Sequence, residues 1–160
     1  MKKIVIYYSY TNHTKMITDM IKKELNCDTL CIKTKNEEEL GYQELVDKYE
    51  KNEIEKPVVD IEKININLDD YDEIILGTPV WWYTITPSIR MFLSQYDLSG
   101  KTIIPFATNA GWLGSTFNEI KELCKNSNVT NEMNIVFNSD YNHPKLITNE
   151  NDIYKWIKSL

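Results

Sequence analysis

Cysteine is scarce in this sequence, and that scarcity excludes two ways of stabilising a small protein. The 160 residues include three cysteines, Cys27, Cys31 and Cys124, an odd number with neither a Cys-x-x-Cys pair nor a Cys/His metal spacing. Cys27 and Cys31 are four residues apart on an expected strand, which separates them by about 13 Å, too far for a disulfide. We therefore expect buried, reduced thiols and a reducing compartment, the cytoplasm.

Positive charge is also in short supply. Lysine and arginine number 18 against 24 acidic residues, the net charge is -6, and Arg90 is the only arginine. A nucleic-acid-binding protein would need a basic patch, and an anionic membrane would repel this chain, so we expect neither partner. The acidic balance suits a protein that meets basic patches on its partners, although it would serve solubility alone equally well.

Long hydrophobic runs are absent as well. No stretch is long enough to span a membrane, and the apolar start at residues 4–8 is too short for a signal peptide. The composition, 42% hydrophobic and 26% charged, is that of a globular protein. We expect one domain over residues 1–160, large enough to be stable without a disulfide or a metal.

What the sequence does contain is an alternation of two hydrophobic patterns. Short apolar runs predict strands at residues 4–8, 27–33, 73–77, 102–107 and 133–137. Helical spacing predicts helices at 14–25, 86–96, 116–124 and 153–160, with a charged outer helix near 42–49 before Pro57. Strands that alternate with helices predict an α/β domain of three layers. Its doubly wound parallel sheet would have five strands in the order 2-1-3-4-5.

Two helix starts carry capping signals. Thr86 before Pro87 is typical of an N-cap with proline at the first helical position. Thr116 with Glu119 predicts a capping box, and we expect Leu123 of the same helix to point inward.

Three loops should meet beside the first strand, because ligands of such sheets bind beyond the carboxyl ends of the strands. The loop at 9–14 enters a helix whose first N–H groups and dipole can hold an anion, helped by hydroxyl groups. The loop at 78–83 carries three adjacent aromatic residues that could stack on a planar ligand. In the loop at 108–114, Gly111 and Gly114 let the backbone approach a ligand. A nucleotide or a flavin would suit such a site.

These loops resemble those of the flavodoxin family, and the resemblance covers nearly the whole chain. The family's phosphate loop has a Ser/Thr-x-Thr-Gly-Asn-Thr type pattern, which Ser9, Thr11 and Thr14 match. Asn12-His13 replaces the Gly-Asn pair, and asparagine tolerates the positive φ that this turn needs. The segment 77–82 is similar to the family's second flavin loop.

The resemblance implies that the cofactor is flavin mononucleotide (FMN). Residues 9–14 would hold the phosphate, residues 78–83 the ring, and residues 108–114 the polar edge of the ring. The residues assigned to FMN in this way are Ser9, Tyr10, Thr11, Asn12, His13, Thr14, Thr78, Pro79, Val80, Trp81, Trp82, Tyr83, Thr108, Asn109, Ala110, Gly111, Trp112 and Gly114.

The implied function is a flavodoxin-type, low-potential electron carrier that meets redox partner proteins through their basic patches. Aromatic rings and an acidic surface should disfavour the anionic, fully reduced flavin. Many relatives have glycine where this chain has Tyr83. In the family, a backbone carbonyl that flips toward the flavin stabilises its one-electron-reduced form, and such a flip is easier at glycine. We therefore expect this form to be weakly stabilised here and the protein to lean toward two-electron transfer. Two alternatives stay open: an FMN-dependent NAD(P)H:quinone or flavin oxidoreductase of the same fold, and a scaffold that has lost its flavin.

Overall fold

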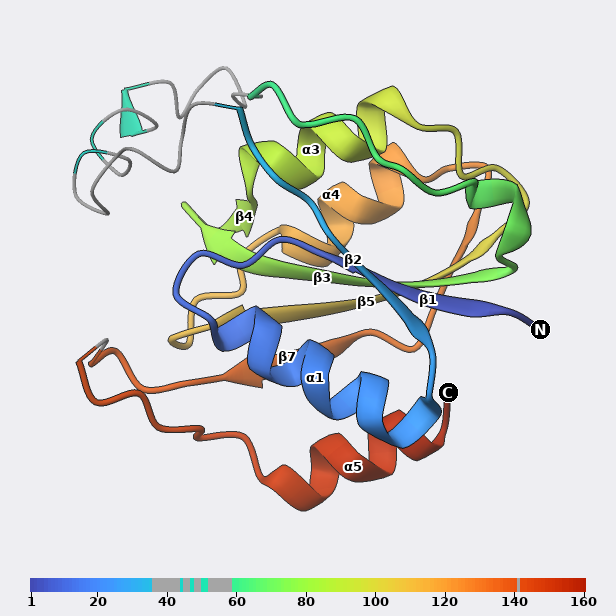
Figure 1. Cartoon of the computed structure of the whole chain (residues 1–160). Coiled ribbons are helices and arrows are strands. Elements are labelled where there is room, and N and C mark those ends of the chain that lie inside the picture. Colours follow the sequence, from blue (N-terminus) through green and yellow to red (C-terminus); the bar gives the residue numbers. More distant parts are fainter. Residues whose placement is uncertain (36–43, 45–46, 48–49, 52–58, 141) are drawn as a thin grey trace.

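A twisted, mainly parallel sheet runs through the middle of the computed structural model, with helices on both of its faces (Figure 1). The structure describes every residue except 36–43, 45–46, 48–49, 52–58 and 141. Most of the helix predicted near residues 42–49 therefore lies outside the described residues.

The strand order confirms the predicted topology. The described strands are β1 (Lys3–Tyr7), β2 (Asp28–Cys31), β3 (Glu73–Trp81), β4 (Thr84–Ile85), β5 (Thr102–Asn109), β6 (Asn128–Val129) and β7 (Met133–Val136). They form the order β2-β1-β3-β5, and both β6 and β7 pair in parallel with β5. The predicted fifth strand at residues 133–137 corresponds to β7, and β6 is an additional short strand that precedes it. β6 pairs with the start of β5 and β7 with its end, and Asn131 between them has a positive φ of 55°.

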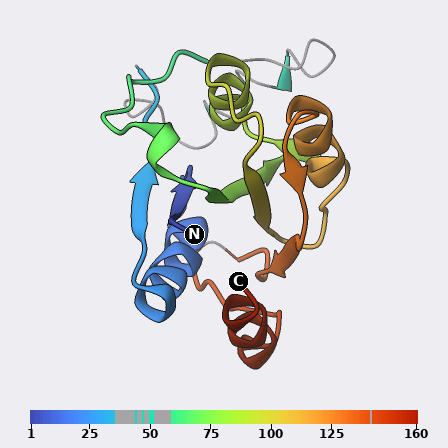
Figure 2. The same cartoon turned by 90° about the vertical axis from the view of Figure 1, so that its right-hand side faces the viewer.

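Two pairs of helices cover the sheet. The helices are α1 (His13–Leu25), α3 (Pro87–Gln95), α4 (Thr116–Leu123) and α5 (Glu150–Lys158), with a 3-10 turn, η2, at Leu68–Asp70. Helices α1 and α5 lie on one face, and α3 and α4 lie on the other (Figures 1 and 2).

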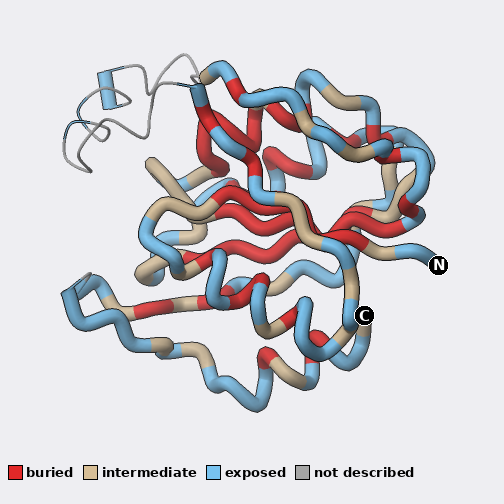
Figure 3. Tube along the Cα trace, in the orientation of Figure 1, coloured by how far each residue is buried: buried red, intermediate tan, exposed pale blue. Residues whose placement is uncertain are grey.

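The central strands contribute side chains to two hydrophobic cores, one on each face of the sheet. On β1, Ile4 and Ile6 point into the core beneath α3 and α4, while Val5 between them points toward α1 and α5. All three are fully buried, and the central strands are buried through most of their length (Figure 3). A strand covered on both faces has no solvent side, which is why these runs read as continuous rather than alternating hydrophobic sequence.

The predicted helix starts were right at one helix and wrong at another. Helix α3 begins at Pro87 with Thr86 as its N-cap, as expected. The capping box predicted at Thr116 is wrong: Ser115 occupies the N-cap position, and the Thr116 hydroxyl donates to the Leu113 carbonyl at 2.6 Å. Leu123 is 38% exposed, so the expectation that it points inward is also wrong.

The cysteines differ in their surroundings. Cys124 is buried, and burial raises the pKa of its thiol to about 11. Cys27 is half-buried and Cys31 is exposed, so the prediction of three buried thiols holds only for Cys124. All three lie in the described part of the chain, and none forms a disulfide. No helix among the described residues is both long enough and apolar enough to cross a bilayer.

Candidate functional site

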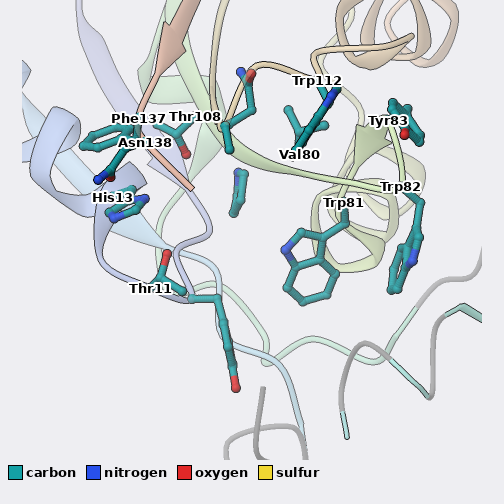
Figure 4. Close-up of a pocket in the computed structure, with 14 residues that line it drawn as sticks. Thr11, His13, Val80, Trp81, Trp82, Tyr83, Thr108, Trp112, Phe137 and Asn138 are labelled. Atoms are coloured by element: carbon teal, nitrogen blue, oxygen red, sulfur yellow. The ribbon is translucent and has the colours of Figure 1, made fainter. Parts of the chain in front are cut away.

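A cleft of about 260 Å³ opens beyond the carboxyl ends of the central strands, where the loops after β1, β3 and β5 meet (Figure 4). Its walls are mostly rings and small polar groups. The lining residues are Tyr10, Thr11, His13, Pro79, Val80, Trp81, Trp82, Tyr83, Thr108, Asn109, Ala110, Trp112, Phe137 and Asn138.

Twelve of these residues are among those predicted to bind a ligand, and the structure brings them together from three separate loops. The other predicted residues do not line the cleft: Ser9, Asn12, Thr14, Thr78, Gly111 and Gly114. Most of these six shape the loops. Thr78, for example, is fully buried, and its hydroxyl donates to the Pro79 carbonyl at 2.7 Å.

The first loop turns into α1 at Asn12. Asn12 has a φ of 66°, as expected for a residue that replaces glycine, and its carbonyl accepts from the Met16 N–H at 2.9 Å. The Ser9 hydroxyl accepts from the Lys15 N–H at 3.2 Å, and the buried Thr14 hydroxyl lies 2.7 Å from that of Thr108. The first turn of α1 holds no acidic residue, so the positive end of the helix dipole is available to an anion.

His13, which was predicted, packs against a wall of the cleft that the sequence did not lead us to predict. Its ring stacks on Phe137, with centroids 4.2 Å apart and planes 6° from parallel, next to Asn138 (Figure 4). Burial lowers the pKa of the His13 imidazole and so favours its neutral form. Phe137 and Asn138 directly follow β7. The rule that ligands bind at the carboxyl ends of parallel strands could have identified them.

The second loop is a β-hairpin rather than the long loop that the sequence predicted from Thr78 onward. β3 continues to Trp81 and pairs in antiparallel fashion with β4. Only Trp82 and Tyr83 remain between the strands, with φ values of 48° and 65°. Two positive φ values are typical of the tight type I′ turn, which glycine and asparagine favour. A bulky residue in that region costs about 1–2 kcal/mol, so this turn is strained.

The aromatic rings of the hairpin differ in how firmly they are held. Trp81 packs edge-on against Tyr8, Tyr10 and Trp82, with centroids 5.9, 6.1 and 5.8 Å from its own. Tyr83 and Trp112 are 58% and 60% exposed at the rim of the cleft. The site thus combines a fixed central ring with outer rings open to a ligand.

The third loop is locked to the hairpin at Gly114. Its φ is 56°, and a Cβ added there would lie 2.1 Å from the Tyr83 carbonyl oxygen. That oxygen also accepts from the Ser115 N–H at 2.7 Å. Nearer the sheet, Asn109 accepts from the Gly111 N–H at 2.9 Å and donates to Asn134 at 2.6 Å. The second and third loops therefore present one continuous wall.

The cleft offers planar stacking surfaces at one side and a helix N-terminus at the other. The described residues that line it include neither lysine nor arginine. An anion here would depend on backbone N–H groups, hydroxyl groups and the dipole of α1. The arrangement suits a ligand with a flat aromatic ring joined to an anionic group.

Comparison with known proteins points to one family. The family model described as flavodoxin matches residues 2–159. No curated protein sequence matches the chain.

Solved structures share the fold. A flavoprotein from Lactobacillus acidophilus NCFM, in complex with FMN, is 23% identical and has a TM-score of 0.72, over 83% of this chain and 91% of that chain. A protein from Bacteroides eggerthii DSM 20697 is 23% identical with a TM-score of 0.74, over 99% and 96% of the two chains. Oxidised Flavodoxin 2 from Bacillus cereus is 18% identical with a TM-score of 0.58, over 99% and 94%.

Proposed function

Because this chain belongs to the flavodoxin family, we propose that it binds FMN in the cleft and transfers electrons through it. The observation that carries the proposal is the position of the aromatic hairpin. Its rings stand across one cleft from the N-terminus of α1, which matches a flavin ring joined to a phosphate. The FMN complex of the Lactobacillus acidophilus flavoprotein, which has the same fold, supports this ligand.

The residues present fit FMN. The N-terminus of α1, with the Thr11 hydroxyl and the left-handed turn at Asn12, would hold the phosphate. Trp82, with Trp81 and Trp112 nearby, would contact the ring, and Asn109 lies where its polar edge could reach. His13 on Phe137 would close the side nearest the phosphate.

FMN when bound supplies one- and two-electron redox chemistry, and the protein supplies position and environment. The rings of the hairpin would exclude water from the flavin ring. The hydrogen bond from Ser115 to the Tyr83 carbonyl holds the turn in one conformation, so rotation of that peptide would break it. Because this bond opposes the peptide rotation that would favour one-electron reduction, we expect the two electrons to be transferred nearly together. Little absorbance at long wavelengths should then appear transiently during reduction.

We further propose that the protein acts as an electron carrier, in the cytoplasm, between redox proteins that carry basic patches. The net charge of -6 supports such partners, because opposite charge speeds encounter between proteins.

An absorption titration of the apoprotein with FMN and, separately, with riboflavin tests the cofactor. Riboflavin has the same ring but no phosphate, so it isolates the contribution of the α1 terminus. We expect FMN to bind at least tenfold more tightly, because a helix N-terminus and several hydrogen bonds together supply 1.4 kcal/mol or more. Equal binding of the two ligands would contradict the phosphate site, and binding of neither would contradict the proposal.

A flavin-dependent quinone oxidoreductase is the second candidate, and the exposed rings at the rim favour it. Tyr83 and Trp112 could stack a planar quinone over the cleft. The FMN-loaded protein should then oxidise NADH or NADPH continuously when a benzoquinone is present and stop when it is left out. A carrier would show no such turnover, yet would pass electrons to a basic cytochrome once it had been reduced chemically.

A further inference from the structure

A buried ion pair lies beneath the aromatic hairpin, where α3 and α4 approach each other. Arg90 of α3 and Glu119 of α4 are 6% and 4% exposed. The guanidinium donates to both carboxylate oxygens, from Nε at 2.6 Å and from Nη2 at 3.2 Å. The only arginine of the chain is thus held inside the protein, away from the lining of the cleft.

Both members of the pair also bond to β4, the returning strand of the hairpin. The Thr84 hydroxyl donates to Glu119 Oε2, and Arg90 Nη2 donates to the Ile85 carbonyl at 3.4 Å. Tyr83, one residue earlier, is bonded to the start of α4 through Ser115. Each of the three residues that follow Trp82 is therefore tied to α3 or α4, and β4 lies beside these helices in Figure 1.

A contribution to stability is a weak explanation for this arrangement. A buried ion pair rarely adds net stability, because removing two charges from water offsets most of their attraction. A turn with two bulky residues at positive φ, in contrast, persists only where its surroundings hold it in place. The ion pair presents hydrogen-bonding groups to both residues of β4, where such a restraint would act.

We propose that Arg90 and Glu119 are positioning residues, which hold the β3–β4 hairpin in its strained turn and so fix Trp82 and Tyr83 against the ligand in the cleft. The inference rests on the proposed FMN function for its main readout. It concerns residues that do not line the cleft and act only through the hairpin.

Two variants and one matched control test the proposal. Glu119→Gln removes the charge of the pair, and Thr84→Val removes only the hydroxyl through which β4 reaches Glu119. Glu73→Gln is the control, because Glu73 is also buried, at 8% exposed, and bonded to a single lysine, Lys3. That pair lies where β1 and β3 begin, at the end of the sheet opposite the cleft.

The measurements are the dissociation constant for FMN, the midpoint of urea unfolding, and the near-ultraviolet circular dichroism of the apoprotein. We expect Glu119→Gln to bind FMN about tenfold more weakly and Thr84→Val about threefold or more, the range for a lost buried hydrogen bond. The FMN affinity of Glu73→Gln should be within about twofold of that of the original protein, even if its unfolding midpoint falls as much as that of Glu119→Gln. The tryptophan bands should change in both hairpin variants and not in the control.

Two results for FMN affinity would overturn the inference. Equal weakening by Glu119→Gln and Glu73→Gln would mean that FMN affinity follows overall stability. An unchanged FMN affinity in Thr84→Val would mean that the link to β4 does not position the hairpin. If Glu119→Gln fails to fold, Thr84→Val alone decides the matter. If the original protein binds no FMN, the proposed function has failed. The near-ultraviolet spectra of the apoproteins then still test the inference, which an unchanged spectrum in both hairpin variants would contradict.

Discussion

Gly114 and Gly100 both occupy the left-handed region, with φ of 56° and 78°, but their surroundings differ. A Cβ at Gly114 would collide with the Tyr83 backbone, whereas one at Gly100 would meet nothing within 4 Å. We expect Gly100→Ala to cost about 1–2 kcal/mol for its conformation alone. Gly114→Ala should cost about 1–3 kcal/mol more because the hairpin must move. Urea unfolding measures both.

The same pair of variants separates stability from function. Gly114→Ala should also weaken FMN binding severalfold, since it displaces the turn that carries Trp82, while Gly100→Ala should leave it unchanged. If both variants cost the same free energy of unfolding, the contact between the second and third loops contributes little.

The half-buried imidazole of His13 gives stability a pH dependence with a defined sign. Because burial lowers its pKa, the unfolded chain takes up a proton at this residue before the folded chain does. The contribution of His13 is therefore fully present above its unfolded pKa, about 6.5, and is lost as the pH falls from there through the lowered folded value. We expect the free energy of unfolding of the apoprotein to fall across that range by more than that of His13→Gln. Parallel curves for the two proteins would exclude the effect.

At the scale of elements, the strain of the β3–β4 hairpin is local to its two-residue turn. Tyr83 is 58% exposed, so replacing it removes little buried surface, and asparagine tolerates positive φ far better than tyrosine. We expect Tyr83→Asn to stabilise the apoprotein by about 0.5–1 kcal/mol without tightening FMN binding. Thermal or urea unfolding measures the gain.

Tyr83→Phe is the matched control for that prediction, because it keeps the ring and the strain. Its unfolding midpoint should equal that of the original protein. A Tyr83→Asn variant less stable than Tyr83→Phe would show that the tyrosine ring stabilises the fold by more than its conformation costs.

At the scale of the whole molecule, the charge of -6 should govern encounters with redox partners. We expect the rate at which the reduced, FMN-loaded protein reduces a basic cytochrome to fall roughly tenfold between about 0.01 and 0.15 M salt, as screening shortens the reach of the charges. Ferricyanide, an anionic acceptor, is the control, and its rate should rise with salt. Rates independent of salt for both acceptors would remove the argument for basic partners.

The carboxyl-edge position of the site could be predicted from the sequence, but its walls could not be predicted completely. Trp81 and Trp82 were recognisable because adjacent large aromatic residues in a predicted loop are not expected to have a core to fill. Phe137 was missed because an apolar residue at the end of a strand is more often part of the core, and here it is both buried and in the lining. Glu119 was misassigned to a capping box because the spacing from Thr116 fits that motif, while its partner Arg90 is 29 residues away along the chain.

The alternation of doubly buried strands with amphipathic helices determined, from the sequence alone, the layers, the strand order and the edge of the sheet at which the loops meet. That was possible because the burial pattern and the handedness of crossovers depend on local sequence and general geometry. Only the tertiary structure decided that β3 continues into a hairpin and that its turn is strained at Trp82 and Tyr83. That turn depends on contacts with α3 and α4, which lie close to it in space and carry no signal in its own sequence.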